Sequence, residues 1–303
     1  MTTVFTVCTA AQFSYAEALH NSLPQSVDFK IGIIGGQVDD EDAVSVSILQ
    51  IPEWEAMSNR YDEAALVAAS KPFFTQYFLQ NSDEVIYFDP TIWVLTKLDP
   101  ILSQLQQNEI VVTPRIVQPF GVSDYADEKF FLNSGLIDSG FYALKNTKQV
   151  FELLNWWQKR VVENANLDLC NAQNHDQLWL MFLPAFYENV AIVKNKSWNV
   201  GLQNLHERTL TKIDKSWFVN QSEELFFINF REITNSKHQD LIKKSGVRLL
   251  FEEYKKEVDG LPQIFSLVRS QRKELSYWKK RLINTLSSIV HKIDTFPIFI
   301  TDK

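Results

Sequence analysis

The chain has 303 residues, of which 45% are hydrophobic and 22% are charged, so it can bury a substantial core and is not a disordered chain. Its formal net charge of -7 argues against binding nucleic acid over the whole surface, and we expect no nucleic-acid partner. The length fits one large α/β domain, or one domain with a helical appendage.

The two cysteines and the N-terminus indicate the cytoplasm. Cys8 and Cys170 have no CxxC spacing, so they support neither a zinc site nor a disulfide framework, and a reducing compartment fits them best. The N-terminus lacks the basic and apolar regions of a signal peptide, and no run of about 18 apolar residues occurs. We therefore expect a cytoplasmic protein that is soluble or peripheral to a membrane.

The first segment predicts a strand over residues 3–10 that runs directly into a helix over 11–23. Nucleotide-binding α/β domains commonly begin in this way. Neither GxGxxG nor GxxxxGK[ST] occurs at the junction, so the Rossmann and P-loop solutions are excluded. Thr9, Ala10 and Tyr15 lie where backbone amides could meet a nucleotide, although simple packing would also account for them.

Three further strands are predicted in the first third of the chain, over residues 30–34, 44–51 and 85–88. A helix is predicted to start at Ser70, because Pro72 is then in its first turn, where proline is accepted. Lys71, at the start of that helix, could bind a phosphate or could simply be solvated.

The apolar run over residues 85–88 ends at an Asp-Pro turn signal at Asp89, and the β-rich run over 92–95 leads to a second one at Asp99. A carboxylate is therefore expected at the carboxyl end of a central strand. Ligands bind at that position in open α/β sheets. The alternative is that Asp89 only caps a turn.

The second half of the chain continues the alternation of strands and helices. Strands are predicted over residues 110–114, 191–193 and 225–230, and helices from Thr147 onward and over 174–183. The polar stretch 115–128 is long for a loop and resembles a binding lid. Two Ser-Gly pairs within 131–144 suggest a bulge or a close approach by a ligand. These elements predict a mostly parallel, three-layer α/β domain.

The C-terminal part has a different character, because only helical patterns follow residue 236. Residues 264–293 repeat apolar side chains at helical spacing and carry seven Lys or Arg against one Glu, a net charge of +6. Such a helix could contact an anionic membrane or a partner, or could pack on its own domain. We expect an α/β domain over 1–232 and a helical extension over 233–303.

The order of these segments resembles that of a GT-A glycosyltransferase, in particular of bacterial enzymes in the glycogenin-like and galactosyltransferase-like group (family 8). EVIYFDPTIWV resembles the strand and the metal-binding DxD element, and DSGFYALK resembles the segment NxGF.AL. NHDQLWLMFLPAFYENVAIVKNKSWNVG resembles a DQ helix, a strand and an N-V turn, and NLHERTL matches a segment of the most similar group. The resemblance covers roughly residues 1 to 230 and implies a GT-A domain that transfers sugars.

The resemblance implies roles for individual residues. DxD carboxylates hold Mn²⁺ or Mg²⁺, which neutralises the diphosphate that leaves the donor sugar. The metal ligands would be Asp89, Thr91 and Asn229, and the donor-site pair Asp176 and Gln177 would be catalytic. The residues expected to bind the nucleotide sugar are Thr9, Ala10, Tyr15, Lys71, Phe88, Asp138, Gly140, Asn199, His206 and Arg208.

The sequence departs from the family pattern at three of these positions. Thr91 stands at the last DxD position, Asp138 replaces the Asn of NxG, and Asn229 stands where a His is expected. A hydroxyl and an amide oxygen are weaker ligands for a hard cation than carboxylate and imidazole. Three hypotheses follow: a metal held weakly by Asp89 with groups such as Asp138, side-chain donors such as Lys71 in place of the metal, or a degenerate site.

The activity that the resemblance implies is transfer of a hexose, with retention of configuration, from a nucleotide-diphosphate sugar to a hydroxyl acceptor. A UDP-sugar is the favoured donor, and the acceptor could be a glycan, a lipid-linked sugar or a protein. The first alternative is a non-catalytic relative that binds a nucleotide sugar or a protein. A nucleotidyltransferase fits less well, because TAAQFSYAEA offers no Gly-rich basic loop. An oligomer is compatible with the sequence, as is contact of residues 264–293 with the inner face of the membrane.

Overall fold

The computed structural model describes residues 1–303 except 37, 120–127, 234–237, 263–280, 283–284 and 287–303. Chain contacts divide the protein into two units, residues 1–268 and 269–303. In the second unit only residues 281, 282, 285 and 286 are described, and they are helical and exposed. The predicted basic helix over 264–293 therefore lies almost entirely outside the described residues, and the fold described below is that of the first unit.

A seven-stranded sheet forms the centre of this unit, in the order β10-β6-β7-β4-β1-β2-β3. Its strands are β1 (Thr2–Thr9), β2 (Asp28–Ile34), β3 (Ala43–Ser45), β4 (Glu84–Phe88), β6 (Ile110–Pro114), β7 (Ile137–Lys145) and β10 (Val190–Ile192). All neighbours pair in parallel except β7, which is antiparallel to β4 and β6. The expected mostly parallel α/β sheet is confirmed.

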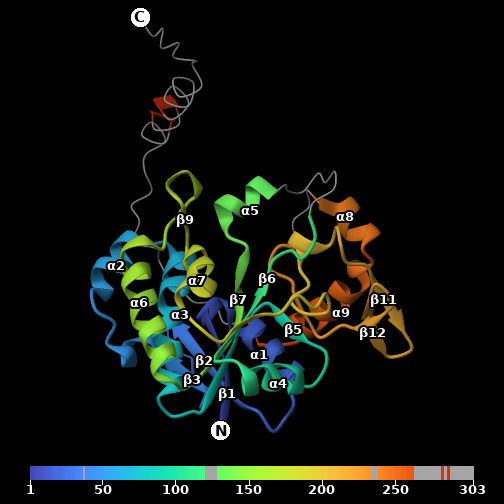
Figure 1. Ribbon diagram of the computed structural model, residues 1–303, viewed down its shortest axis with the longest axis horizontal. Coiled ribbons are helices and arrows are strands. Elements are labelled where there is room, and N and C mark those ends of the chain that lie inside the picture. The colour runs from blue at the N-terminus through green and yellow to red at the C-terminus, as the bar shows by residue number, and fades with distance from the viewer. Residues whose placement is uncertain (37, 120–127, 234–237, 263–280, 283–284, 287–303) are drawn as a thin grey trace, which may run out of the picture. The chain divides into compact units, whose positions relative to one another are not determined.

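Helices cover both faces of the sheet, which makes the three layers that the sequence predicts (Figure 1). They are α1 (Phe13–Ser22), α2 (Trp54–Arg60), α3 (Glu63–Leu79), α4 (Asp99–Gln107), α5 (Glu128–Ser134), α6 (Lys148–Asn164) and α7 (Leu183–Phe186). The alternation of side chains along β1 separates two cores. Phe5 and Val7 pack with α3 and α6, whereas Val4 and Cys8 pack with α1 and α4.

A third core lies beside the main sheet. It is built from β5 (Ile92–Val94), β11 (Leu210–Ile213), β12 (Ser216–Val219), β14 (Phe227–Asn229), α8 (Gln239–Lys244) and α9 (Val247–Asp259), and the exposed β13 (Glu223–Glu224) pairs with β12. The short strands β8 (Leu167–Asp168) and β9 (Gln173–Asn174) pair with each other elsewhere. Antiparallel pairing of β14 with β5 places Asn229 opposite Ile92. The last strand therefore returns to the segment that follows Asp89.

Three element predictions need correction. The helix predicted from Ser70 begins at Glu63, because Asp62 caps it by accepting a bond from Ala65 N at 3.0 Å, and Pro72 lies inside it. Residues 44–51 form only the end of β3 and a 3-10 helix over Val46–Leu49. The helix predicted over 174–183 is a strand end, a turn and a 3-10 helix over Leu178–Phe182. Its start is broken at His175, which has a φ of 49°.

Other predictions agree closely with the structure. Thr147 caps α6, and its side chain accepts a bond from Val150 N at 3.4 Å. The run over 131–144 is divided between the end of α5 and β7. The middle of the predicted loop, residues 120–127, lies outside the described residues. The strand expected over 225–230 is β14, and it joins β5 and not the main sheet.

Candidate functional site

Asp89 follows β4 directly and lies at the carboxyl end of that central strand. Its backbone N–H donates to Gly140 O at 2.8 Å, which continues the pairing of β4 with β7 and fixes the direction of the side chain. The carboxylate is almost fully buried. A Cβ on Gly140 would lie 2.7 Å from Asp89 Oδ2 and 2.9 Å from Asp138 Oδ1, so only glycine lets these carboxylates come this close to the backbone.

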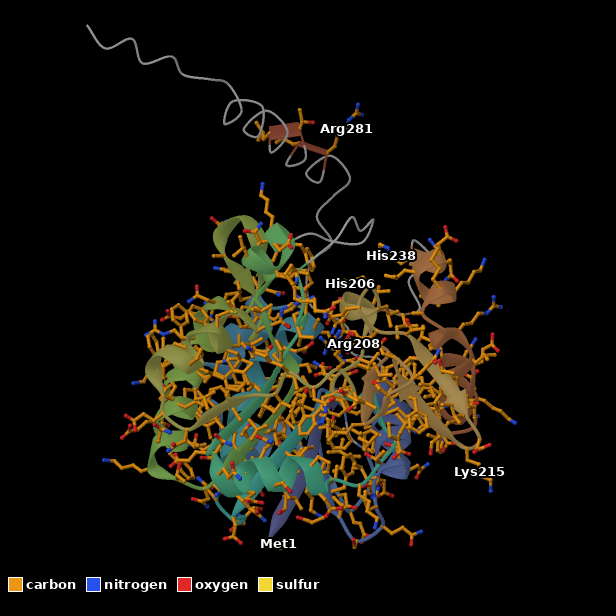
Figure 2. The ribbon with its side chains drawn as sticks, turned by 45° about the vertical axis from the view of Figure 1, so that its right-hand side comes forward. Met1, His206, Arg208, Lys215, His238 and Arg281 are labelled. Atoms are coloured by element: carbon orange, nitrogen blue, oxygen red, sulfur yellow. The ribbon has the colours of Figure 1, made fainter. Side chains whose placement is uncertain are left out.

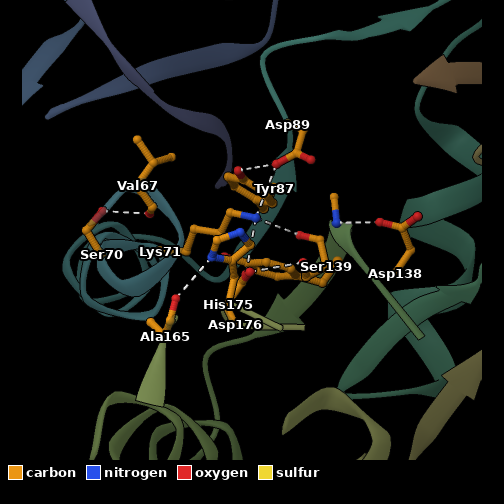
Figure 3. Close-up of polar contacts among 12 residues, drawn as sticks. Val67, Ser70, Lys71, Tyr87, Asp89, Asp138, Ser139, Ala165, His175 and Asp176 are labelled. Atoms are coloured by element: carbon orange, nitrogen blue, oxygen red, sulfur yellow. Dashed lines mark hydrogen bonds and ion pairs between the residues drawn. The ribbon is translucent and has the colours of Figure 1, made fainter. Parts of the chain in front are cut away.

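Lys71, from the middle of α3, joins the two carboxylates that the sequence singled out. Its Nζ lies 3.2 Å from Asp89 Oδ1 and 3.1 Å from Asp176 Oδ2, and it donates to Ser139 O at 3.2 Å (Figure 3). All three side chains are buried. Its ammonium also lies 4.9 Å from the ring centroid of Tyr87, a cation–π contact. Lys71 is therefore part of the site and is not a solvated lysine.

Asp176 and Gln177 are held by the loop that follows β9. Asp176 Oδ1 accepts a bond from Ser139 Oγ at 3.2 Å, and its backbone O accepts one from Trp157 Nε1 at 3.1 Å. Gln177 Nε2 donates to Ser134 O. The structure therefore brings Asp176 to the Asp89 cluster from a distant part of the chain, whereas the Gln177 amide faces α5.

The balance of charges keeps Asp89 ionised. Burial pushes the pKa of Asp89 up, but the charges of Arg231 and Lys71 and the Tyr87 hydroxyl outweigh it, so that the pKa lies below its ordinary value. Tyr87 donates to Asp89 Oδ1 at 2.6 Å. Burial and the neighbouring Asp89 hold the pKa of Tyr87 well above its usual range, so the phenol keeps the proton that it donates.

Arg231, which the sequence analysis did not single out, forms an ion pair with Asp89 Oδ2 through its guanidinium. Its side chain is 51% exposed, so one end of this pair is open to solvent. The backbone N–H of Arg231 donates to Asn229 Oδ1 at 3.0 Å. A basic residue two positions after the expected ligand Asn229 was the signal that could have identified it.

The side chains expected to hold a divalent cation do not fit one as they stand. The Asp89 oxygens accept from Tyr87 and face two cations. Asn229 Oδ1 accepts from Thr91 Oγ1 at 2.8 Å and from the Arg231 backbone. Within the described residues, no three His, Cys, Asp or Glu side chains come together as a cation site. The expected Mn²⁺ or Mg²⁺ thus lacks a donor set here.

Asp138 lies next to this cluster but is engaged with other partners. Its Oδ1 accepts from Gly140 N at 2.7 Å, and its Oδ2 accepts from Gln203 Nε2 at 3.2 Å. Gln203 is buried and belongs to the segment after Asn199. Gln203 and Ser139 both contribute to the site, and the sequence analysis missed both. A serine or a glutamine alone does not indicate a ligand site, because its role depends on the residues that it contacts.

The residues expected at the start of the nucleotide site have different surroundings. Thr9 and Ala10 are buried where β1 ends, and Thr9 N donates to Gln12 Oε1 at 3.2 Å. Tyr15 is half-buried and lines a cavity together with Thr91 and Arg231. The side chain of Phe88 lies fully in the core, so that any contact of this residue with a donor would be through its backbone.

Asn199, His206 and Arg208 belong to one largely buried segment, whose Gln203 contacts Asp138. Asn199 Nδ2 donates to Thr113 Oγ1 at 3.0 Å, and Arg208 donates to Trp198 O at 2.7 Å. Burial lowers the pKa of Arg208 to about 10, although Glu207 opposes this. His206, labelled with Arg208 in Figure 2, is half-buried, and burial lowers its pKa. Arg208 therefore supports the segment from inside.

A cavity of about 700 Å³ opens beside Arg231. Tyr15, Thr91 and Arg231 form its wall toward Asp89, and α8 and α9 form the other side. The basic residues in its lining are Arg231, Lys243, Arg248 and Lys255, and the acidic ones are Glu252 and Asp259. A volume of this size can hold a small organic molecule, and the excess of cations favours an anion.

Comparisons with known proteins find likeness in structure alone. No protein-family model and no curated protein matches the chain. The structure of the galactosyltransferase LgtC in complex with donor and acceptor sugar analogs is similar to this chain, with a TM-score of 0.51 and 11% sequence identity. The match covers 88% of this chain and 98% of the LgtC chain.

Among the helices that the structure describes, none has the length and apolar character needed to cross a membrane.

Two further solved structures are similar at lower scores. A glycosyltransferase involved in glycosylation of the major capsid of PBCV-1 covers 80% of this chain and 98% of its own, with a TM-score of 0.45 and 9% identity. The match to the glycosyltransferase GlyE of Streptococcus pneumoniae TIGR4 covers 84% of this chain and 64% of the GlyE chain, with a TM-score of 0.46 and 13% sequence identity. The likeness to LgtC carries the conclusion: this chain has the GT-A glycosyltransferase fold.

Proposed function

We propose that this chain is a glycosyltransferase that moves a hexose from a nucleotide-diphosphate sugar to a hydroxyl acceptor. One observation carries the proposal: a chain with the fold of LgtC places Asp89, Lys71 and Asp176 in contact at the carboxyl ends of its central strands. Ligands bind at that edge in open α/β sheets. Perturbed pKa values cluster at functional sites, and, although burial opposes this, the charged partners of Asp89 hold its pKa below the ordinary value.

Each group has a task in this reaction. Transfer breaks the bond from the anomeric carbon to the diphosphate and forms one from that carbon to the acceptor oxygen. The acceptor's proton leaves with the nucleoside diphosphate. Lys71 and Arg231 would offset the charge that develops on the diphosphate, and Asp176 and Gln177 would orient the sugar and the acceptor. Retention of configuration and a UDP-sugar donor are parts of the proposal that rest on the family 8 resemblance.

The acceptor and the C-terminal segment complete the proposal. A glycan, a lipid-linked sugar and a protein hydroxyl are the acceptor classes to be tested. The domain over 1–232 would hold the Asp89 cluster, and the extension over 233–303 would add α8 and α9 as the other side of the adjoining cavity. The basic segment 264–293 would bring the enzyme to an anionic membrane surface, and deletion of residues 264–303 would then release the protein from anionic vesicles.

A non-catalytic protein that binds nucleotide sugars is the second candidate. It is favoured by Thr91 and Asn229, which stand where stronger cation ligands are expected. This second candidate predicts that the chain binds a nucleotide sugar without releasing its nucleoside diphosphate, and the assay described next distinguishes the two functions.

The test is a donor panel of UDP-, GDP- and dTDP-hexoses, incubated with the full chain and followed by phosphorus NMR. The proposal predicts that one donor releases its nucleoside diphosphate, and faster when a hydroxyl acceptor is added. Binding by calorimetry with no release from any donor would support the second candidate. Neither binding nor release across the panel would contradict both.

A further inference from the structure

We infer that the guanidinium of Arg231 takes the place of a divalent cation, so that this chain binds a nucleoside diphosphate through side-chain cations and needs no metal. The inference rests on the proposed function and specifies its donor site. It follows from three relationships around Asp89.

The first relationship is the pairing of Asp89 itself. Its Oδ1 lies 3.2 Å from Lys71 Nζ, and its Oδ2 forms the ion pair with Arg231. Both oxygens of the carboxylate expected to bind a metal are therefore already matched by a positive charge. A divalent cation would have to displace a guanidinium that is charged at every accessible pH.

The second relationship is the direction of the Asn229 amide. The Arg231 backbone N–H and the Thr91 hydroxyl both lie at Asn229 Oδ1, at 3.0 and 2.8 Å. A backbone N–H only donates, so the atom that faces it must be the oxygen. The amide nitrogen is then the atom near Gly140, 3.1 Å from the position of a Cβ there. Asn229 thus presents a donor toward Asp89 where a cation would need an acceptor.

The third relationship is the cavity that Arg231 enters. Its side chain is half exposed, and it lines the 700 Å³ cavity with Lys243, Arg248 and Lys255. Arg248 pairs with Glu252 on α9. Lys243 and Lys255 form no ion pair within the described residues. A planar guanidinium can hold two phosphate oxygens at once, and nearby ammonium groups add charge without fixing geometry.

These relationships predict opposite effects for two substitutions. Arg231→Gln removes the guanidinium and should weaken binding of a diphosphate about tenfold or more. Asp89→Asn removes the carboxylate that competes with the diphosphate for Arg231, so it should make binding tighter. A metal-dependent site would instead lose binding with Asp89→Asn, because that carboxylate would hold the metal.

The experiment is calorimetry of UDP, GDP and dTDP with the full chain, in EDTA and again in Mn²⁺. Arg160→Gln, an exposed arginine on α6, is the matched control. We expect the wild type and Arg160→Gln to bind one nucleotide equally in both buffers, within about twofold, and Arg231→Gln to bind it more weakly. Binding that appears only with Mn²⁺, or that Asp89→Asn abolishes in a folded variant, would overturn the inference but not the proposed function.

A titration of Mn²⁺ into the nucleotide-free chain, followed by electron paramagnetic resonance, tests the donor set separately. We expect no wild-type site tighter than about millimolar, and a gain of one site when Thr91→Asp, Asn229→His and Arg231→Ala are combined. A tight wild-type site that Asp89→Asn removes would overturn the inference. If no nucleotide binds under any condition, the proposed function fails, and the Mn²⁺ result still decides whether Arg231 excludes a metal.

Discussion

Lys71 and Asp176 meet inside the protein, with Nζ and Oδ2 3.1 Å apart, although one comes from the middle of α3 and the other from the loop after β9. Asp89 lies on the other side of the same ammonium. This single contact ties together the helix, the central strand and the loop that form the site. Its energetic consequences can be measured before any substrate is known.

The first prediction concerns the stability of the cluster. Lys71→Met leaves Asp176 and one oxygen of Asp89 without their buried cation, so we expect a loss of about 3–5 kcal/mol in the free energy of unfolding. Lys148→Met is the control, since Lys148 is exposed and, among the residues that the structure describes, pairs with Glu152 at i,i+4, and it should cost less than about 0.5 kcal/mol. Urea denaturation gives both values. Equal losses would contradict a buried charge cluster.

The second prediction compares two stacked tyrosines whose ring centroids are 4.8 Å apart. The Tyr87 hydroxyl bonds the charged Asp89, whereas the Tyr142 hydroxyl bonds the neutral Thr75 at 2.7 Å. Hydrogen bonds to charged groups contribute about 1.5–3 kcal/mol and neutral ones about 0.5–1.5 kcal/mol. Tyr87→Phe should therefore cost more stability than Tyr142→Phe in the same urea experiment. The reverse order would mean that Asp89 is not ionised.

The third prediction concerns acid denaturation. The pKa of Asp89 is lower in the folded protein than in the unfolded chain, where it is about 3.9. Asp89 therefore stabilises the protein fully above that value, and the contribution is lost as the pH falls through the folded pKa. We expect the wild type to lose more stability than Asp89→Asn between about pH 5 and pH 2. Parallel curves of unfolding free energy against pH would contradict this.

The fourth prediction concerns the glycine beside the carboxylates. Gly140→Ala would force its methyl group to within 2.9 Å of both Asp89 and Asp138, so we expect a loss of about 1–3 kcal/mol and weaker nucleotide binding. Gly260→Ala is the control, because its Cβ would meet α9 carbonyls at 3.4 and 3.5 Å. Thermal unfolding and calorimetry measure the two effects. Wild-type stability and nucleotide binding in Gly140→Ala would show that the close contact between the Gly140 backbone and the two carboxylates is unimportant.

The position of Asp89 could be predicted from the sequence, because an apolar run that ends in Asp-Pro places a carboxylate at a strand end. The burial of Lys71 could not, since a lysine is buried only when its partners are, and Asp89 and Asp176 are distant in sequence. Strand alternation places the Phe88 side chain on the same face as Ile86, in the core, so the predicted role of Phe88 in ligand binding would use its backbone.

Two predicted helix boundaries differ from those in the structure, each because of a local sequence signal. Pro72 favours a helix that starts at Ser70, with the proline in its first turn, but Asp62, followed by Glu63, is the stronger N-cap signal. The apolar run after Gln177 is short, so helical periodicity could not separate a 3-10 helix from an α-helix. The place of Arg231 beside Asp89 depends on the β14–β5 pairing, and its only local signal is a basic residue two positions after Asn229.

The most direct test of the account is the rate of donor turnover in Asp176→Asn and in Asp99→Asn, a matched change of an exposed carboxylate at the start of α4. With the donor and acceptor found in the panel, phosphorus NMR measures release of the nucleoside diphosphate. We predict that Asp176→Asn lowers kcat/KM by about a hundredfold or more and that Asp99→Asn stays within about twofold of the wild type. Wild-type turnover by Asp176→Asn would show that the reaction does not take place at this cluster.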